Sequence, residues 1–204
     1  MLKSFCIGLT GGIASGKSTA IAHFKTLGAH TLSADDFAHR LLETDEILLK
    51  KIAHTFGPSI LKEEKHIKRS IIRHHCVEHP EFRQWLESQI HTKVIRQIQQ
   101  QIEPTKTTYY VIEMPLILEI KNTLKFDRIC LVDATPSQQK QRLKQRNTWT
   151  QAHIEAFIAL QATRTERLSS ADDIINNTDT IKHLHAQVEQ LHQQYRHDLG
   201  QKTP

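Results

Sequence analysis

A glycine-rich segment near the N-terminus limits the possible folds of this chain more than any other feature. Residues 11–18 read Gly-Gly-Ile-Ala-Ser-Gly-Lys-Ser and match the pattern G-x-x-x-x-G-K-[ST] at every fixed position. Residues 3–9, which include the apolar Phe5, Ile7 and Leu9, predict a short strand before the segment, and residues 18–27 predict a helix that ends before Gly28. A strand, a glycine-rich loop and a helix in this order are typical of an α/β domain that binds phosphate groups.

The chemistry of this loop predicts that it binds a nucleoside triphosphate. Glycines let the backbone approach a polyphosphate, and the N–H groups at the start of the helix attract its negative charge. Lys17 can reach the β- and γ-phosphates, and the hydroxyl of Ser18 can ligate Mg²⁺. The alternative, a glycine-rich turn without a ligand, is disfavoured by the strand and the helix around it. The loop alone does not say which reaction the nucleotide serves.

The rest of the chain alternates between predicted strands and predicted helices. Further strands are expected at 30–33, 109–112, 128–132 and 173–175. Helices are expected at 35–42, 45–56, 67–102 with an interruption at Pro80, 137–146, 151–168 and 181–199. Strands separated by helices predict a doubly wound parallel sheet of the α/β class, because parallel neighbours need crossover connections.

Length and composition exclude several classes of protein. With 204 residues, 38% of them hydrophobic and 24% charged, the chain is expected to form one globular domain and not a disordered chain. No apolar run approaches the roughly 18–20 residues that span a bilayer, which excludes an integral membrane protein. The net charge of +5 fits an anionic partner. Three widely spaced cysteines, Cys6, Cys76 and Cys130, predict no disulfide framework and a cytoplasmic location.

Acidic residues follow two of the predicted strands. Asp35 and Asp36 come directly after the strand at 30–33, and the carboxyl ends of parallel strands meet at the ligand crevice. One of them could accept a proton from a substrate hydroxyl, and the alternative is a cap for the next helix. The residues themselves do not distinguish Asp35 from Asp36. Glu113 ends the strand at 109–112 and is either a Mg²⁺-binding acid or an ordinary polar residue at a strand end.

A basic helix is predicted after the strand at 128–132. Arg142 and Arg146 are four residues apart and therefore share one face of it. In a kinase, such arginines could close over the transferred phosphoryl group. The alternatives are a solvated charged face or a patch that binds nucleic acid.

Histidines are numerous, and a few of them cluster in one predicted helix. His74, His75, Cys76 and His79 include one pair four residues apart, which could bind zinc. The cluster has no second ligand pair at the spacing of a zinc finger, so a helical surface is favoured.

Several short segments outside the glycine-rich loop form a distinctive set. They are Leu27-Gly28-Ala29, Ala34-Asp35, Phe56-Gly57, Arg69, Pro115-Leu116-Ile117 with Glu119, Val132-Asp133, Gln139, Arg142, Arg146, Gln161, Arg164 and the block from Ala171 to Asn177. Together with residues 8–19, this set resembles the dephospho-CoA kinase family over most of the chain. Other small P-loop kinases share the loop but not the downstream set.

The resemblance implies a fold and a reaction. Members of that family transfer the γ-phosphoryl group of ATP to the 3′-hydroxyl of the dephospho-CoA ribose with Mg²⁺, giving CoA and ADP in the last step of CoA biosynthesis. The implied architecture is a single P-loop kinase domain over 1–204, with a helical CoA-binding insertion at about 60–105 and a lid at about 137–165. The implied partners are ATP and dephospho-CoA, with neither nucleic acid nor membrane, in a monomer or a weak homo-oligomer.

The resemblance also implies roles for individual residues. Asp35 becomes the catalytic base in preference to Asp36, and Lys17 and Arg142 act on the phosphoryl group. The residues implied to bind the nucleotide are Gly11, Gly12, Ile13, Ala14, Ser15, Gly16, Lys17, Ser18, Thr19, Arg146 and Asn177. The residues implied to bind the acceptor are Asp35, Arg69, His91, Pro115 and Leu116, and the metal residues are Ser18 and Glu113.

The chain departs from the family pattern at several positions. Ala14 stands where glycine is common, so the loop must accommodate a Cβ atom there. Other departures are Ser33, His39, Thr92 and the Thr178-Asp179 pair, and an Asp-Gly turn before Arg69 is missing. These departures concern substrate contacts, whereas Lys17, Ser18, Asp35 and Arg142 are all present.

Two other functions fit parts of the sequence. A kinase for another small hydroxylated metabolite would share the loop and differ in its acceptor. A nucleotide-dependent switch or nucleic-acid-binding module would share the loop and bind polyanions in a salt-sensitive way. Only 6% of the residues are aromatic, and they do not alternate with the basic residues, which disfavours stacking on nucleic-acid bases.

Overall fold

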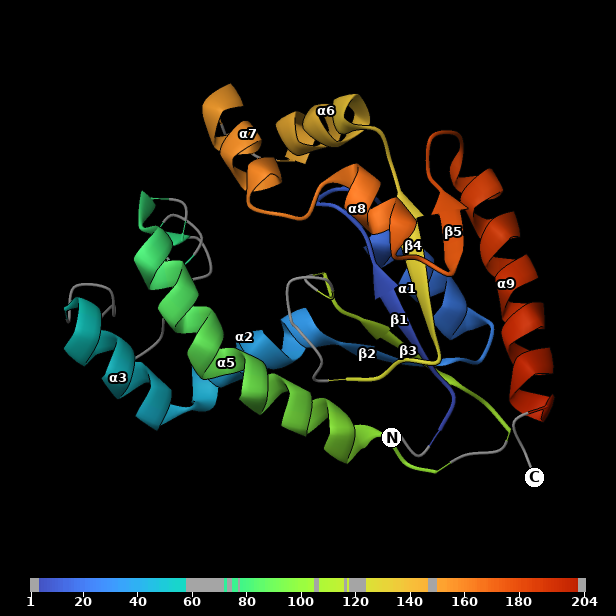
Figure 1. Cartoon of the computed structure of the whole chain (residues 1–204), viewed down its shortest axis with the longest axis horizontal. Coiled ribbons are helices and arrows are strands. Elements are labelled where there is room, and N and C mark those ends of the chain that lie inside the picture. Colours follow the sequence, from blue (N-terminus) through green and yellow to red (C-terminus); the bar gives the residue numbers. More distant parts are fainter. Residues whose placement is uncertain are drawn as a thin grey trace. The chain divides into compact units, whose positions relative to one another are not determined.

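The sheet places the N-terminal strand at its centre. The computed structural model describes residues 4–57, 72, 75–76, 78–104, 107–115, 117, 124–146 and 150–201. Within these residues, five strands form one parallel sheet in the order β2-β3-β1-β4-β5 (Figure 1). The strands are β1 (Cys6–Thr10), β2 (His30–Ser33), β3 (Tyr110–Glu113), β4 (Arg128–Asp133) and β5 (Asp173–Asn176). The predicted α/β class with a parallel sheet is confirmed.

Helices connect the strands and follow the last one. They are α1 (Lys17–Thr26), α2 (Ala34–Thr44), α3 (Glu46–Phe56), α5 (Pro80–Gln101), α6 (Pro136–Arg146), α7 (Gln151–Ala159), α8 (Arg164–Ser169) and α9 (Ile181–Gln201). The described residues divide into two compact units, one formed by Met1–Ser33 with Gln99–Pro204 and the other by Ala34–Ile98. The first unit contains the sheet, and the second contains α2, α3 and most of α5.

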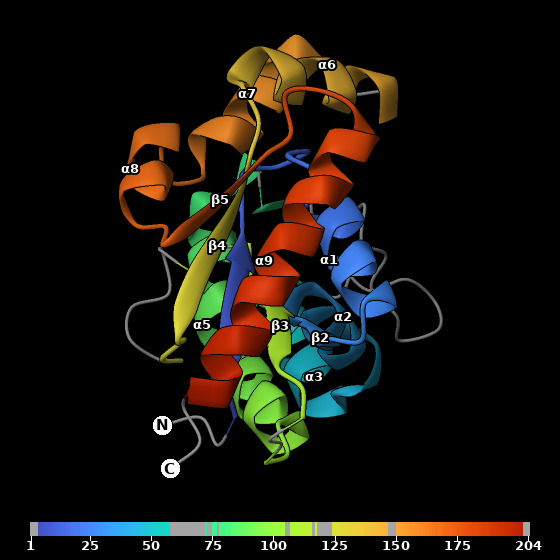
Figure 2. The same cartoon turned by 90° about the vertical axis from the view of Figure 1, so that its right-hand side faces the viewer.

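Helices lie on both faces of the sheet in the first unit. The helices α1 and α9 pack against each other on one face, whereas α8 packs against β4 on the opposite face (Figure 2). Phe24 of α1 and Tyr195 of α9 are fully buried and stack, with ring centroids 6.1 Å apart. Each such buried aromatic or aliphatic side chain contributes roughly 2–3 kcal/mol through the apolar area removed from water.

A buried polar network joins β4, β5 and α9 in the same core. Arg128 bonds both oxygens of the Asp173 carboxylate at 2.8 Å, and the Tyr195 hydroxyl donates to Asp173 Oδ2 at 2.8 Å. Burial raises the pKa of the neighbouring Cys130 thiol to about 12. The thiol is therefore protonated at neutral pH and packs as a small apolar side chain.

The second unit is a small helical cluster. Phe56 of α3 contacts the rings of Phe82 and Trp85 on α5, at centroid distances of 4.7 and 5.1 Å. Asp45 caps α3 by accepting from the Leu48 N–H at 2.9 Å, and it also accepts from the Lys93 ammonium. Burial opposes ionisation of Asp45, but these hydrogen bonds outweigh it and lower the pKa of its carboxyl.

One prediction of a helix boundary is wrong, and another is confirmed. The single helix predicted at 151–168 is divided into α7 and α8, because Thr163 and Glu166 form a capping box that starts a new helix. The predicted interruption at Pro80 is present: Cys76 and Glu78 are helical, His79 is not, and Pro80 begins α5, where its missing N–H costs no hydrogen bond.

The register of the sheet brings the ends of its strands to one edge. Leu9 of β1 pairs with Glu113 of β3, which in turn pairs with Ser33 of β2. On the other side of β1, Asp133 at the end of β4 pairs with Asn176 at the end of β5. The loop at 11–16 continues from β1 at this edge. The candidate functional site is therefore built at the carboxyl ends of the strands, where ligands of doubly wound folds bind.

Candidate phosphate-binding site

The glycine-rich loop leads from β1 directly into α1. Gly16 precedes the first residue of α1 and has a left-handed backbone, with φ 106° and ψ 17°. Within the described residues, no side chain caps the N-terminus of this helix, and its first turn contains no acidic residue. The positive end of the helix dipole is therefore left for an anion.

Gly16 is also the point where the loop meets the segment after β5. A Cβ atom at this position would lie 2.1 Å from Nδ2 of Asn177, far inside van der Waals contact. The Asn177 side chain is buried and donates through this nitrogen to the carbonyl of Ser15 at 2.6 Å. Only glycine therefore satisfies both the backbone conformation and the close approach of Asn177.

Ala14 adopts the conformation that a glycine would favour. Its φ is +56°, and it is the only described non-glycine residue with a positive φ. An alanine in the left-handed region costs about 1–2 kcal/mol relative to its normal conformations. The departure from glycine at this position therefore places backbone strain inside the loop.

Lys17 folds back over the loop. Its ammonium donates to the carbonyl of Gly11 at 2.9 Å and to that of Gly12 at 3.1 Å. The hydroxyl of Ser15, in contrast, is the one buried side-chain polar atom without a hydrogen-bond partner among the described residues. The loop thus holds one cation and one unsatisfied hydroxyl, both suited to the oxygens of a phosphate group.

Arg142 of α6 bridges the loop and Asn177. Its Nη1 donates to the carbonyls of Ala14 at 3.2 Å and Ser15 at 3.3 Å, and its Nη2 donates to the carbonyl of Asn177 at 2.8 Å. The structure thus brings together Arg142, Ala14, Ser15 and Asn177, four residues that the sequence predicted to act at one site. In this structure the guanidinium contacts backbone carbonyls of the loop.

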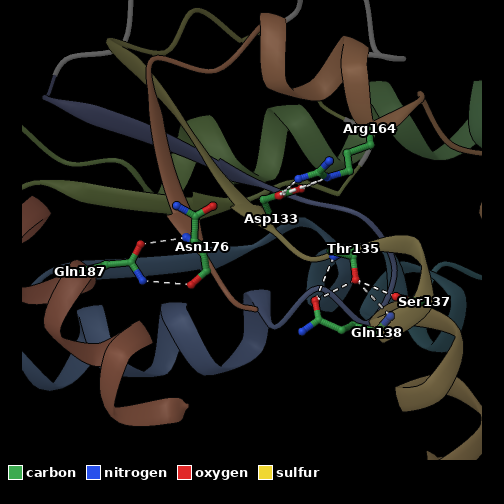
Figure 3. A network of polar contacts seen from close by, with 7 residues as sticks. All are labelled: Asp133, Thr135, Ser137, Gln138, Arg164, Asn176 and Gln187. Carbon is green, nitrogen blue, oxygen red and sulfur yellow. Dashed lines mark hydrogen bonds and ion pairs between the residues drawn. The ribbon is translucent and has the colours of Figure 1, made fainter. Parts of the chain in front are cut away.

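The start of α6 is fixed by a reciprocal pair of hydrogen bonds. The Gln138 N–H donates to the Thr135 hydroxyl at 3.3 Å, and the Thr135 N–H donates to Oε1 of Gln138 at 3.1 Å (Figure 3). Gln138 also donates to the carbonyl of Thr178, which follows Asn177, at 3.0 Å. This capping box sets the direction in which α6 leaves the sheet.

Asp133 and Arg164 form an ion pair at the end of β4. The guanidinium makes two parallel contacts, from Nε to Oδ1 at 3.0 Å and from Nη2 to Oδ2 at 2.7 Å (Figure 3). The Asp133 side chain is buried, whereas that of Arg164 is partly exposed, and the carboxylate raises the pKa of Arg164. The pair ties the start of α8 to the sheet edge where the loop begins.

Three side chains that had no predicted role also contact the loop. Gln139 donates to the carbonyl of Ile13 at 2.9 Å, and Gln161 accepts from the N–H of Ile13 at 2.9 Å. Nη2 of Arg167 lies 2.9 Å from the position of a Cβ atom at Gly12. Gln139 and Gln161 belong to the family resemblance, but neither amide carries a sequence signal for this contact. Nothing in the sequence pointed to Arg167.

The predicted acids lie at the ends of two neighbouring strands or just beyond. Glu113 is the last residue of β3 and pairs with Leu9, two residues before Gly11. Asp35 and Asp36 lie in the first turn of α2, directly after β2, and both are exposed. Carboxylates in the first turn also stabilise a helix, so their position fits a cap as well as a base.

The remaining predicted residues are only partly described. Pro115 lies next to the loop, because its carbonyl accepts from the Thr10 hydroxyl at 3.3 Å. His91 lies on α5 in the second unit, where burial lowers the pKa of its imidazole. Arg69 and Leu116 lie outside the described residues, and for Arg146 the structure describes only the backbone at the end of α6.

The histidine cluster is partly described as well. His75 and His79 stack with ring centroids 5.5 Å apart, while His74 lies outside the described residues. In the described part of the chain, no group of three or more His, Cys, Asp or Glu side chains could hold a metal ion. None of the helices described here is long and apolar enough to cross a membrane.

The fold and the site together define a P-loop protein of the α/β class, with the loop between the central strand and α1. A family model described as dephospho-CoA kinase matches residues 5–183. The chain belongs to the dephospho-CoA kinase family, and it is an ATP-dependent kinase. The predicted family, enzyme class and fold class are confirmed.

Individual relatives agree with this assignment. A dephospho-CoA kinase of Coxiella burnetii is 39% identical over 190 residues, which cover 93% of this chain and 96% of the relative. The solved dephospho-CoA kinase of Campylobacter jejuni is 26% identical with a TM-score of 0.61, covering 95% of this chain and 98% of that one. A solved Thermus thermophilus protein has the same fold, with a TM-score of 0.75 at 24% identity over 92% of this chain and 96% of that one.

Proposed function

We propose that this chain phosphorylates the 3′-hydroxyl of the dephospho-CoA ribose with MgATP, giving CoA and ADP as the last step of CoA biosynthesis. The observation that carries the proposal is the loop itself: an uncapped helix N-terminus after a left-handed Gly16, with the Lys17 ammonium folded over it. This arrangement is suited to the β- and γ-phosphates of a triphosphate. The choice of acceptor rests on membership of the family.

The nucleotide is proposed to bind along the loop. Lys17 exchanges its contacts with the carbonyls of Gly11 and Gly12 for phosphate oxygens, which are stronger acceptors because they are charged. Residues 11–19 surround the phosphates, and Asn177 and Arg146 bind the rest of the nucleotide. Arg142 lies beside the loop on carbonyls that a phosphoryl oxygen can replace, so we assign it to the transferred group.

Asp35 is proposed to act as the general base. It follows β2 by two residues and is exposed at the start of α2. A carboxylate there would orient the ribose hydroxyl for in-line attack and accept its proton. Asp36 occupies the same helical turn and is assigned to stabilising the start of α2.

Mg²⁺ is proposed as the metal that accompanies ATP. Ser18, the second residue of α1, has an exposed hydroxyl, and Glu113 ends the strand next to β1. Both side chains offer the hard oxygen atoms that Mg²⁺ prefers, so the residues fit the ion. When bound, the metal would neutralise part of the charge that develops on the phosphates.

The acceptor is proposed to bind through a helical insertion at about 60–105, with a lid at about 137–165. Within the insertion we assign Arg69 and His91 to dephospho-CoA, and beyond it Pro115 and Leu116. The helical unit Ala34–Ile98, which includes part of this insertion, is compact by itself. The enzyme is further proposed to be a cytoplasmic monomer or weak homo-oligomer that binds neither nucleic acid nor membrane.

The test is a comparison of acceptors. ADP release is measured with MgATP and dephospho-CoA, and in parallel with adenosine, AMP, shikimate and gluconate. We expect rapid release with dephospho-CoA only, together with formation of CoA. Faster release with another acceptor would agree with a kinase but would refute dephospho-CoA as its acceptor. ATP binding without turnover on any acceptor would instead favour a nucleotide-dependent switch.

A further inference from the structure

Ile13 is held by side chains on both of its backbone polar groups. Its N–H donates to Oε1 of Gln161 and its carbonyl accepts from Nε2 of Gln139, each at 2.9 Å. Gln139 comes from α6, and Gln161 from the connection between α7 and α8. The two glutamines are 22 residues apart in sequence and lie at opposite ends of the proposed lid, yet both bond the same residue of the loop.

The contact of Gln139 with the loop is close and buried. The Gln139 side chain is 2% exposed, and its Nε2 lies 2.1 Å from the position that a Cβ atom would take at Gly12. The amide therefore lies directly over the Gly12 backbone, where only glycine leaves room for it. A buried amide in such a place is costly unless its hydrogen bond is made.

Gln161 is itself held in place from α8. The buried guanidinium of Arg167 donates to the carbonyl of Ala162, the residue after Gln161, and it also lies next to Gly12. The connection that carries Gln161 is therefore fixed against the loop.

The two glutamines limit the backbone rotation of Ala14, the strained residue that follows Ile13. Ala14 has a φ of +56°, which a rotation of the Ile13–Ala14 peptide would convert to the negative values that alanine prefers. That rotation would also turn the Ile13 carbonyl away from Gln139. Because a trans peptide directs its C=O and N–H to opposite sides, the bond to Gln139 directs the Ala14 N–H to the other side of the peptide.

The Ala14 N–H is therefore a hydrogen-bond donor that a ligand can use. Among the described residues, it has no hydrogen-bond acceptor. Successive N–H groups of a glycine-rich loop form a concave site for phosphate oxygens. The orientation of this N–H thus depends on whether Ile13 is held.

We propose that Gln139 and Gln161 are positioning residues that hold the Ile13–Ala14 peptide in its strained orientation, so that the Ala14 N–H faces the polyphosphate of the bound nucleotide. The proposal rests on the proposed function only in taking a nucleoside polyphosphate as the ligand. It assigns the two glutamines a specific task in this chain, where alanine stands in place of glycine. With glycine at position 14 the left-handed conformation is free of strain, and the glutamines are less needed.

The test uses the same substitution at three glutamines. Gln139 acts as a donor and Gln161 as an acceptor, so Gln139→Glu removes the bond to Ile13, whereas Gln161→Glu keeps an oxygen for the Ile13 N–H. Both changes add one negative charge next to the same residue. Gln141→Glu adds the same charge at an exposed position of α6 and serves as the control. Binding of MgADP is measured by calorimetry, and the KM for ATP and kcat are measured with dephospho-CoA.

We expect Gln139→Glu to weaken MgADP binding about tenfold and to raise the KM for ATP by a similar factor, with a smaller change in kcat. Gln161→Glu should lose no more than about threefold, and Gln141→Glu no more than about twofold. In an Ala14→Gly background, the loss caused by Gln139→Glu should shrink to about threefold or less. If the charge prevents Gln139→Glu from folding, Gln139→Met takes its place in the experiment. It keeps the length of the side chain but lacks the donor, so it should show the same loss of MgADP binding.

Equal losses for Gln139→Glu and Gln161→Glu would overturn the proposal, as would a loss at Gln139 that is unchanged when position 14 is glycine. A merely structural role for the glutamines would lower the thermal stability of the ligand-free protein without this dependence on position 14. Failure of the proposed function has a different signature. In that case the wild-type protein does not phosphorylate dephospho-CoA, and the MgADP titration still decides the role of the glutamines.

Discussion

Replacement of Gly16 by alanine should destabilise the protein in two ways, through strain in the loop backbone and through displacement of Asn177. The φ of +106° is unfavourable for alanine by about 1–2 kcal/mol, partly offset by about 0.4–1 kcal/mol from the stiffer unfolded chain. The new Cβ atom would also lie 2.1 Å from Asn177 Nδ2. The Asn177 side chain must then move and lose its buried bond to the Ser15 carbonyl, which costs about 1–3 kcal/mol. We therefore expect Gly16→Ala to lower the free energy of unfolding by about 2–4 kcal/mol.

Gly28 provides a matched control for the backbone contribution. Its φ of +96° is similar, but a Cβ atom there meets no other atom within 4 Å. Gly28→Ala should therefore cost only about 0–1 kcal/mol. The difference between the two variants, about 1–3 kcal/mol, measures the displacement of Asn177.

The assay is urea unfolding of the ligand-free protein, followed by circular dichroism and by tryptophan fluorescence. Asn177→Ala in the Gly16→Ala background removes the collision, so the double variant should lose less stability than the sum of the two single variants. Equal destabilisation by Gly16→Ala and Gly28→Ala would refute the reasoning, because it would mean that Asn177 moves at no cost.

Three further predictions follow from other parts of the structure. Asp35→Asn should lower kcat about 10²–10⁴-fold with little change in the KM for ATP, and Asp36→Asn should not; similar steady-state kinetics for the two variants would refute the choice of Asp35. Tyr195→Phe should lower the free energy of unfolding by about 1–2 kcal/mol in urea, because the Asp173 carboxylate loses a buried donor, and an unchanged midpoint would contradict this. Burial lowers the pKa of His192 below its ordinary value of 6.5, so the unfolded chain binds the proton more readily and stability should fall as the pH drops below about 6.5. His192→Asn should flatten that part of the stability–pH curve, and a curve of the same slope would show that His192 does not contribute.

Much of the loop could be predicted from the sequence because its structure is local. The strand β1, the turn through Gly16 and the start of α1 depend on neighbouring residues and on backbone conformations that only certain residue types adopt. The parallel sheet could also be predicted, since strands that alternate with helices along a chain can form few other folds. The break between α7 and α8 was missed because the apolar pattern continues across it, although Thr163 and Glu166 carry the signal of a capping box.

The sequence by itself therefore determined the fold class, the phosphate-binding loop and, through its resemblance, the family. Only the tertiary structure decided which side chains hold that loop in shape. Asn177 and Gln139 contact the loop from positions more than 120 residues away, and a polar amide in a chain gives no sign of the carbonyl that it will bond. Likewise, the sequence marks Ala14 only as a departure from the glycine common at its position, whereas its strained backbone and the distant side chains that bond the residue before it are visible only in the folded structure.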